Sequence, residues 1–158
     1  FSSLCKTWPD LRLTLIARPK PGGATESLMN RLGLAERIRF VGNATHEDIN
    51  RLYAESAVAV VPSLYEGFGL PAVEAMAAGI PLVSSDGGAL SEVVSSGGLQ
   101  VPAGDSAALV SALHKVLSCP ELARDLGNRG LARAKTHFCW SICARQMVRL
   151  YRASIDRC

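Results

Sequence analysis

The stretch AVAVVPSLYEGFGLPAVEAMAAG, residues 57–79, decides the fold class of this chain. Its opening run, Ala57 to Val61, is continuously apolar and ends at Pro62, as expected of a strand buried on both faces of a sheet. A helix is predicted over residues 70–78, because Pro71 suits a first helical turn and Gly79 provides a stop. A buried strand that leads directly into a helix is the repeating unit of parallel α/β folds.

The same alternation of strands and helices continues on both sides of this stretch. Further strands are predicted over residues 11–17, 38–41, 80–84 and 99–101. Further helices are predicted over residues 25–32 and 46–55, and a short helix is predicted to end at residue 94. Three more helices are predicted to begin at residue 105 or 106, at residue 120 and at residue 140. Thr45 is the predicted N-cap of the helix over residues 46–55, and Asp48 completes a capping box there. The pattern predicts a single doubly wound α/β domain, with a Rossmann-like parallel sheet and helices on both faces.

Composition argues for an ordinary globular protein and against several other classes. Of the 158 residues, 48% are hydrophobic and 20% are charged, and the net charge is only +3. Lys and Arg are spread along the chain rather than gathered in a stripe, so a nucleic-acid partner is not expected. No apolar run approaches the roughly 20 residues that cross a bilayer, and a cytoplasmic location is expected. The cysteines are odd in number, lack a Cys-x-x-Cys pair and are expected to be reduced: Cys5, Cys119, Cys139, Cys143 and Cys158.

The loop that joins the predicted strand to the predicted helix is the candidate functional segment. In parallel sheets, ligands bind beyond the carboxyl ends of the strands, which is where this loop lies. Gly67 and Gly69 allow a sharp turn and a close approach of the backbone to a ligand. The N–H groups of Phe68, Gly69 and Leu70 are expected to point outward from the helix N-terminus. Free donors and the helix dipole together suit a phosphate.

Two glutamates flank this predicted anion site. Glu74 lies about one turn inside the helix, where a carboxylate could accept two hydrogen bonds from a ribose diol. Glu66 precedes the turn and can face a sugar on the other side of a diphosphate. A carboxylate in that place can stabilise an oxocarbenium-like transition state or attack it. A single glutamate is usually only solvated, but the combination of a strand, Pro-Ser, Glu, Gly-Phe-Gly, Pro and a second Glu is much less common by chance.

The segment EGFGLPAVEAMAAGIPLVSSDGG, residues 66–88, resembles the signature of the family-4 retaining glycosyltransferases (GT4), which have the GT-B fold. The similarity covers nearly the whole chain, and the hallmark of a Glu, seven residues and a second Glu falls on Glu66 and Glu74. The resemblance implies that Glu66 acts at the anomeric centre of the donor sugar and that Glu74 holds the nucleotide ribose. It also implies that the segment from Gly67 to Leu70 binds the donor, with backbone amides on the phosphates and sugar hydroxyls.

The resemblance further implies an activity and a set of partners. A sugar would pass, with retention, from a UDP-, GDP- or ADP-sugar to a saccharide or lipid-linked acceptor in polysaccharide biosynthesis, with no cofactor and no metal ion. Gly42 and Asn43 resemble the family's nucleobase-contacting loop. Residues 1–158 are then expected to be the donor-binding domain without its first strand and without the amino-terminal acceptor domain. That missing half is itself an expected partner, and peripheral membrane association could occur through it. The chain alone is expected to be inactive or nearly so.

Two other interpretations stay open. A non-catalytic nucleotide-binding domain of GT-B type would share the fold without turnover, and upstream Arg and Lys residues would argue against it. A GT-B phosphorylase or epimerase is less favoured, because those enzymes usually lack this spacing of glutamates.

Several other side chains carry weaker signals. Asp86 is predicted to form a local turn, bonding nearby backbone N–H groups. No metal site is expected, because the sequence has no Asp-x-Asp and its histidines are far apart: His46, His114 and His137. A basic run near the end is expected to be a solvated helix face or a domain contact: Arg145, Arg149, Arg152 and Arg157.

Overall fold

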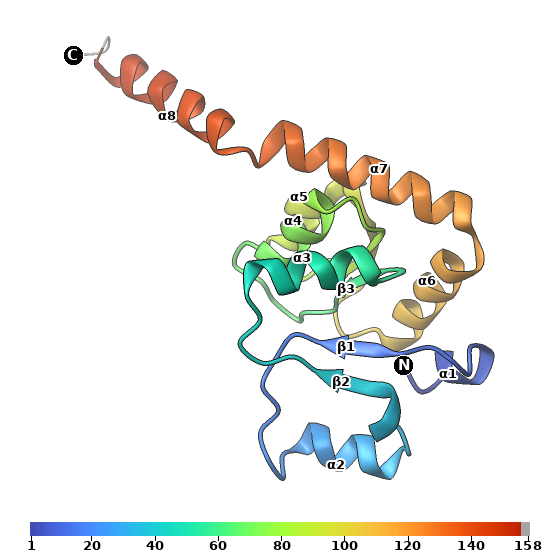
Figure 1. Ribbon diagram of the computed structural model, residues 1–158. Coiled ribbons are helices and arrows are strands. Elements are labelled where there is room, and N and C mark those ends of the chain that lie inside the picture. The colour runs from blue at the N-terminus through green and yellow to red at the C-terminus, as the bar shows by residue number, and fades with distance from the viewer. Residues whose placement is uncertain (156–158) are drawn as a thin grey trace. The chain divides into compact units, whose positions relative to one another are not determined.

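The computed structural model describes residues 1–155 of the chain (Figure 1). Arg157 and Cys158, which the sequence-based predictions included, lie outside that range. The chain forms two compact units, one from Phe1 to Leu52 and one from Tyr53 onward.

The first unit is built on two parallel strands. Its elements are α1 (Leu4–Thr7), β1 (Leu13–Leu15), α2 (Ala24–Arg31), a 3-10 turn (Ala35–Arg37) and β2 (Ile38–Phe40). Leu13 lies opposite Ile38 in the ladder between β1 and β2. The helix α3 (His46–Glu55) begins in this unit and ends in the second one.

The start of α3 confirms the predicted capping box. The hydroxyl and the N–H of Thr45 both donate to the Asp48 carboxylate, at 2.8 and 3.1 Å, and the Asp48 N–H donates to Thr45 Oγ1 at 3.1 Å. These bonds favour the ionised carboxylate, with the hydroxyl of Thr45 contributing most, so the pKa of Asp48 is lowered from its usual value of 3.8. Local sequence alone specifies this helix start.

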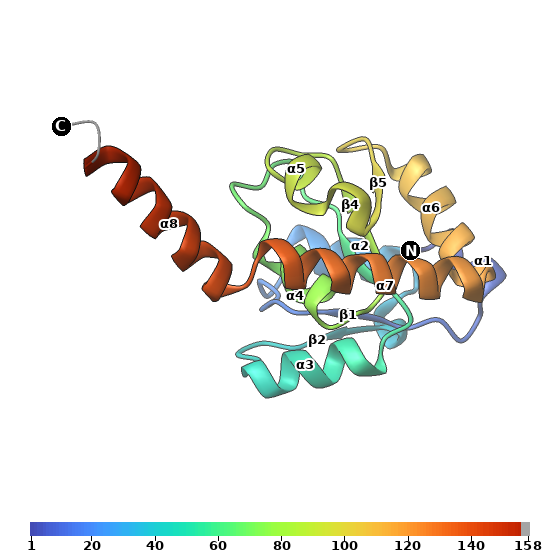
Figure 2. The same cartoon turned by 90° about the horizontal axis from the view of Figure 1, so that it is seen from above.

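The second unit is a three-stranded parallel sheet in the order β3-β4-β5 with helices packed on it (Figures 1 and 2). Its elements are β3 (Ala59–Val61), α4 (Leu70–Ala77), β4 (Leu82–Ser85), α5 (Leu90–Val94), a 3-10 turn (Ser95–Gly97), β5 (Leu99–Val101), α6 (Ser106–Ser118), α7 (Pro120–His137) and α8 (Trp140–Ile155). The helix α4 connects β3 to β4 and packs on both strands, whereas α6 packs on β4 and β5. Within this unit, α7 packs along α4.

The predicted alternation of parallel strands and helices is confirmed, and the pairing of the strands differs in one respect. The sequence predicted one sheet, whereas hydrogen bonds join the described strands into two parallel sheets, one in each unit. An apolar run indicates that a segment becomes a strand but does not specify its neighbour, because pairing depends on how the crossovers return the chain.

The core of the second unit explains why β3 reads as a continuous apolar run and why β4 is buried along its length. Leu82 and Val83 are fully buried, and Met76 of α4 packs into the same core. The helix α7 approaches this core closely because Gly130 carries no side chain: a Cβ there would lie 2.9 Å from the carbonyl oxygen of Gly97. The sheet and α4 therefore form a rigid base for the loops that follow β3 and β4.

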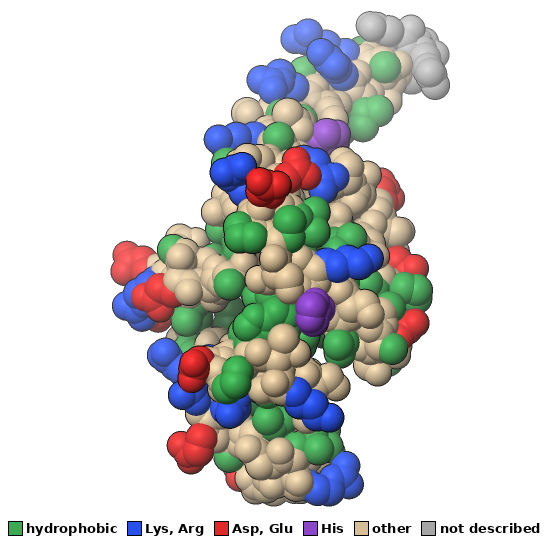
Figure 3. Space-filling view, turned by 90° about the vertical axis from the view of Figure 1, so that its right-hand side faces the viewer, with side chains coloured by type: hydrophobic (Ala, Val, Ile, Leu, Met, Phe, Trp, Pro, Cys, Tyr) green, Lys and Arg blue, Asp and Glu red, His purple; other side chains and the backbone are tan. Residues whose placement is uncertain are grey.

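The last helix, α8, has no buried residue among its described positions. Basic side chains gather along it (Figure 3). Arg145, Arg149 and Arg152 are all exposed. None of the helices in the described part of the chain combines the length and apolar character needed to cross a membrane. The four described cysteines, Cys5, Cys119, Cys139 and Cys143, are free thiols.

Candidate functional site

The loop after β3 and the loop after β4 run side by side at the carboxyl edge of the sheet. Glu66 pairs with Gly88 in an isolated parallel bridge beyond the ends of both strands. The Ala89 N–H donates to the carbonyl oxygen of Glu66 at 2.9 Å. The backbone of Glu66 is therefore held by the neighbouring loop and does not hang free in solvent.

Two glycines make this close approach sterically feasible. A Cβ on Gly87 would lie 2.5 Å from the carbonyl oxygen of Leu64. Gly88 has a φ of +62°, and a Cβ there would lie 3.0 Å from the amide nitrogen of Glu66. Any other residue at either position would push the two loops apart.

The Glu66 side chain is partly buried and has a hydrogen-bond donor of its own. The Ser63 hydroxyl donates to Oε1 of Glu66 at 2.9 Å. Ser63 is held in turn by Ser85, the last residue of β4, whose hydroxyl donates to the Ser63 carbonyl oxygen. Sequence reasoning counted Ser63 only as part of the Pro-Ser pair before Glu66 and gave it no role, and it did not single out Ser85. The spacing of three residues between Ser63 and Glu66 was the one available signal for the first, and none pointed to the second.

The N-terminus of α4 has the form expected of an anion site. Gly69 is its N-cap, with a φ of +91° and a ψ of 49°, and no side chain caps the helix. Within residues 1–155, the N–H groups of Phe68, Gly69 and Leu70 donate to no other group. These donors and the helix dipole are available together at one point. The donor-binding role of the segment from Gly67 to Leu70 stays a prediction.

Phe68 connects this loop to the junction between α7 and α8. Its ring meets that of Phe138 edge to face, with centroids 5.9 Å apart and planes at 86°. The guanidinium of Arg133 lies 5.8 Å from the centroid of the Phe138 ring. Arg133 is itself held by the carbonyl oxygens of Glu92 and Val93, at 2.6 and 2.7 Å. The aromatic residue before Cys139 therefore supports the candidate site from a distant part of the sequence.

Glu74 lies within α4, as predicted, and is partly buried. Its charge acts on Tyr53, whose hydroxyl donates to the Pro71 carbonyl oxygen at 3.2 Å. Burial of the phenol, together with the charge of Glu74, raises the pKa of Tyr53 to about 12. The side chain of Tyr53 packs against the core cluster and so supports the first turn of α4.

Gly42 and Asn43 lie in the first unit, in the loop that follows β2. Both are exposed, and Asn43 adopts a left-handed conformation with a φ of 54°. A Cβ on Gly42 would lie 2.9 Å from Cγ of Arg18, so the glycine leaves room for that arginine. The structure brings Glu66, the Gly67–Leu70 segment and Glu74 together on the second unit. The assignment of Gly42 and Asn43 to the nucleobase stays a prediction.

Asp86 differs from its predicted role as a local turn former. Its carboxylate accepts a hydrogen bond from the N–H of Ala103 at 2.8 Å, and its own N–H donates to the Val101 carbonyl oxygen at 3.0 Å. Asp86 therefore ties the loop after β4 to the loop after β5. The prediction was wrong because parallel strands bring together loops that are distant in sequence.

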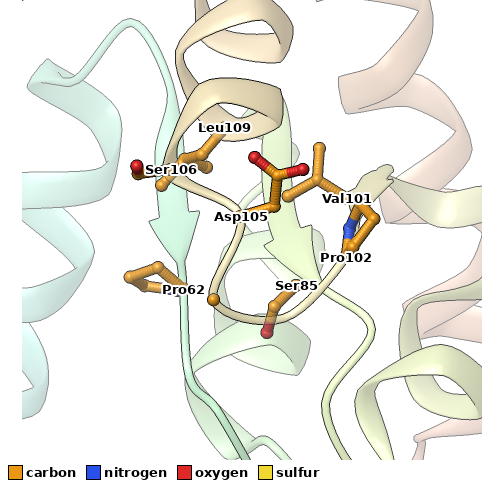
Figure 4. Close-up of a pocket in the computed structure, with 8 residues that line it drawn as sticks. Pro62, Ser85, Val101, Pro102, Asp105, Ser106 and Leu109 are labelled. Carbon is orange, nitrogen blue, oxygen red and sulfur yellow. The ribbon is translucent and has the colours of Figure 1, made fainter.

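A shallow pocket of about 170 Å³ lies beside these loops, at the ends of β4 and β5 and the start of α6 (Figure 4). Its lining is mainly apolar and comprises Pro62, Ser85, Val101, Pro102, Gly104, Asp105, Ser106 and Leu109. Asp105 is already engaged as the cap of α6, accepting a hydrogen bond from the Ala108 N–H at 2.8 Å. None of the sequence-predicted site residues lines this pocket.

Candidate metal ligands do not cluster in the part of the chain that the structure describes. Residues 1–155 contain no group of three His, Cys, Asp or Glu side chains placed to hold a metal ion. Neither the site loops nor the three histidines provide such a group.

Residues 1–133 match the model of the family described as glycosyl transferases group 1. The chain belongs to this family. Over 152 residues it is 41% identical to an MMP alpha-(1->4)-mannosyltransferase of Mycolicibacterium hassiacum, a match that covers 94% of the chain and 37% of the relative. It is also 39% identical over 115 residues to O-antigen chain mannosyltransferase B of Escherichia coli, covering 73% of the chain and 30% of the relative. The chain thus spans about a third of the length of these relatives.

Solved structures with the same fold extend the comparison. A sucrose-phosphate synthase from Thermosynechococcus elongatus matches with a TM-score of 0.84 and 35% identity, over 99% of the chain and 42% of that protein. HepE from Anabaena, solved in complex with UDP-glucose, matches with a TM-score of 0.77 and 20% identity, over 96% of the chain and 52% of that protein. The latter likeness is one of fold.

Proposed function

We propose that this chain is the donor-binding part of a retaining glycosyltransferase that moves a sugar from a nucleotide-diphosphate sugar to a saccharide or lipid-linked acceptor. The observation that carries the proposal is one short segment that presents a carboxylate, then a set of free amides, then a second carboxylate. This segment lies in a chain of the group 1 family. The first carboxylate is Glu66, the amides belong to Phe68, Gly69 and Leu70, and the second carboxylate is Glu74.

Each part of the segment has a chemical task in this proposal. The free amides at the start of α4 bind the diphosphate, because unpaired N–H groups and the positive end of a helix dipole favour an anion. Glu74 repels phosphate but can accept hydrogen bonds from both ribose hydroxyls. Glu66 lies before the turn and faces the sugar at its anomeric carbon. Gly42 and Asn43 are proposed to contact the nucleobase.

The proposed reaction breaks the bond between the anomeric carbon and the diphosphate oxygen, which keeps the electron pair. The acceptor hydroxyl oxygen forms the new bond to that carbon on the same face, and its proton passes to the departing diphosphate. Positive charge develops on the sugar ring, where the Glu66 carboxylate stabilises it or attacks the carbon to give a covalent intermediate. Donors at the start of α4 offset the charge on the diphosphate, so the proposal includes no metal ion.

The acceptor site is proposed to lie in the part of the protein outside these residues. The chain covers 37% of its relative from Mycolicibacterium hassiacum and 42% of the sucrose-phosphate synthase, so most of each relative lies elsewhere. Mannose is the sugar to test first, because relatives that are 41%, 39% and 40% identical are named mannosyltransferases. A cytoplasmic location is consistent with a nucleotide-sugar donor and is part of the proposal.

The proposal is tested by calorimetric titration of the chain with UDP, GDP and ADP. We expect one nucleotide to bind and Glu74→Ala to weaken it by at least tenfold, because two hydrogen bonds to a charged group are lost. Glu55→Ala is the matched control, since Glu55 is exposed at the end of α3. Equal losses in the two variants would remove Glu74 from the site.

Failure of all three nucleotides to bind directs the same titration to the protein with its upstream region. No binding there would contradict the proposal. If the protein with its upstream region binds a nucleotide but turns over no nucleotide-sugar, the result would instead favour the non-catalytic nucleotide-binding domain. Glu66 would then have no reaction to support.

A further inference from the structure

The Glu66 carboxylate is oriented by a side chain that the proposed reaction does not itself use. Ser63 Oγ donates to Oε1 of Glu66 at 2.9 Å, and both residues are partly buried. A hydroxyl donating to a carboxylate makes a charge-assisted hydrogen bond, which is stronger than a bond between neutral groups. The bond leaves Oε2 of Glu66 without a described partner in residues 1–155.

Ser63 is in turn fixed by the sheet. Its carbonyl oxygen accepts a hydrogen bond from the hydroxyl of Ser85, which is only 2% exposed at the end of β4. The Glu66 backbone is held separately, by the bridge to Gly88 and the bond from the Ala89 N–H. With the backbone fixed at both points, the remaining freedom of Glu66 lies in its side-chain torsions. The Ser63 hydroxyl is the described group that restricts them.

We propose that Ser63 is a positioning residue for Glu66 and that Ser85 holds Ser63 in place. The inference rests on the proposed function of Glu66 at the sugar. A carboxylate aimed before charge develops on the substrate stabilises that charge without the cost of reorganising during the reaction. Ser63 acts through Glu66 and touches no reacting atom. Its effect is therefore expected in the rate of the chemical step rather than in nucleotide binding.

A purely structural role for the same hydrogen bond makes different predictions. A bond that only closes the loop would, when lost, lower thermal stability and donor affinity along with turnover. It would do so whether or not residue 66 carries a carboxylate. The two roles therefore separate in the split between kcat and KM, and in a background that lacks Glu66.

The experiment measures donor turnover and nucleotide binding by the full protein with Ser63→Ala, Ser63→Thr and Glu66→Ala. We expect Ser63→Ala to lower kcat about tenfold, with the donor KM and the affinity for the nucleotide changed by less than about twofold. Ser63→Thr keeps the hydroxyl and is expected to recover most of kcat. Ser111→Ala is the matched control, because Ser111 is exposed on α6 and makes no hydrogen bond described in residues 1–155.

The decisive comparison adds Ser63→Ala to Glu66→Ala. We expect no further loss of kcat in that double variant, since the carboxylate that Ser63 positions is gone. A further loss, or a rise in KM equal to the fall in kcat, would overturn the inference and leave Ser63 as a loop contact. Retention of full kcat by Ser63→Ala would also overturn it. Retention of full kcat by Glu66→Ala would instead refute the proposed function of Glu66, so the two failures are distinct.

If Ser63→Ala fails to fold, as judged by its thermal unfolding, the second variant is Ser85→Ala. It leaves the hydroxyl of Ser63 in place and removes only the bond to the Ser63 carbonyl oxygen. A fall in kcat with unchanged nucleotide affinity is expected here as well, and unchanged kcat would count against the inference.

Discussion

The ring of Phe68 meets the ring of Phe138 edge to face, with centroids 5.9 Å apart and planes at 86°, although the two residues lie 70 positions apart in the sequence. Phe68 belongs to the candidate donor loop, and Phe138 follows α7 and packs against the core cluster. The contact holds the loop at Phe68, whereas Gly88 and Ala89 hold it at the backbone of Glu66. The loop is thus supported from two independent parts of the fold.

We expect the Phe68–Phe138 pair to be energetically coupled. Phe138→Leu keeps apolar volume but loses the edge-to-face contact and the contact with the Arg133 guanidinium, at a cost of about 1 kcal/mol in the free energy of unfolding. A double-mutant cycle with Phe68→Leu, followed by urea unfolding, measures the coupling. Strict additivity of the two changes would show that the ring contact contributes nothing.

Gly69→Ala is expected to destabilise the protein more than an ordinary glycine substitution at positive φ. Gly69 has a φ of +91°, and a Cβ there would lie 2.6 Å from Cδ2 of the fully buried Leu90. Backbone strain and overpacking together are expected to lower the free energy of unfolding by about 3 kcal/mol. Gly33→Ala is the matched control, since Gly33 has a φ of +64° with no atom within 4 Å of the added Cβ. Equal decreases in the free energy of unfolding of the two variants would mean that the Leu90 side chain moves aside without an energetic cost.

Stability is expected to fall at alkaline pH because of Tyr53. Its pKa is raised from 10.0 to about 12 in the folded state, by burial first and by the charge of Glu74 second. Between these two values the unfolded chain loses the phenol proton while the folded chain keeps it. The free energy of unfolding therefore decreases as pH rises from 10, by about 1–2 kcal/mol after allowing for solvent screening.

Tyr53→Phe removes this titration, and unfolding by urea at about pH 9 and about pH 12 measures the difference between the two proteins. Glu74→Gln is expected to lower the pKa of Tyr53, which absorbance of the tyrosinate reports. If neither substitution changes the absorbance titration of the tyrosinate, the tyrosine with the raised pKa is not Tyr53.

Asp48 is expected to contribute to stability only while its carboxylate is ionised. The hydroxyl and N–H of Thr45 lower its pKa below 3.8, so the contribution is complete above that value and is lost as pH falls through the folded-state pKa. Asp48→Asn should therefore be less stable than the native chain near neutral pH and converge with it in acid. Thermal unfolding across the acid range measures this, with Asp125→Asn, an exposed residue of α7, as the control. Parallel curves would contradict the prediction.

Local sequence was sufficient to predict most of the elements. The helix over residues 46–55 has the predicted bounds, and its capping box is present atom by atom, because a capping box depends on residues within one turn. The strand over residues 99–101 is also as predicted. The strands predicted over 11–17 and 57–61 are shorter in the structure, at Leu13–Leu15 and Ala59–Val61. Apolar character extends beyond the paired residues, so sequence alone overestimates strand length.

The candidate site divides in the same way. Sequence alone determined the Glu66–Glu74 spacing, the glycine turn and the start of α4, because these features lie within one continuous segment. It also indicated the family to which the chain belongs.

Only the tertiary structure decided what holds that segment in place. Three other parts of the chain provide these contacts: the bridge from Gly88 to Glu66, the hydrogen bond from the Ser85 hydroxyl to Ser63, and the ring of Phe138 against Phe68. Parallel strands and their crossovers bring such residues together at the edge of the sheet, and no local pattern records that meeting. The sequence thus determined which groups are available for chemistry, whereas the fold decided which neighbours orient them.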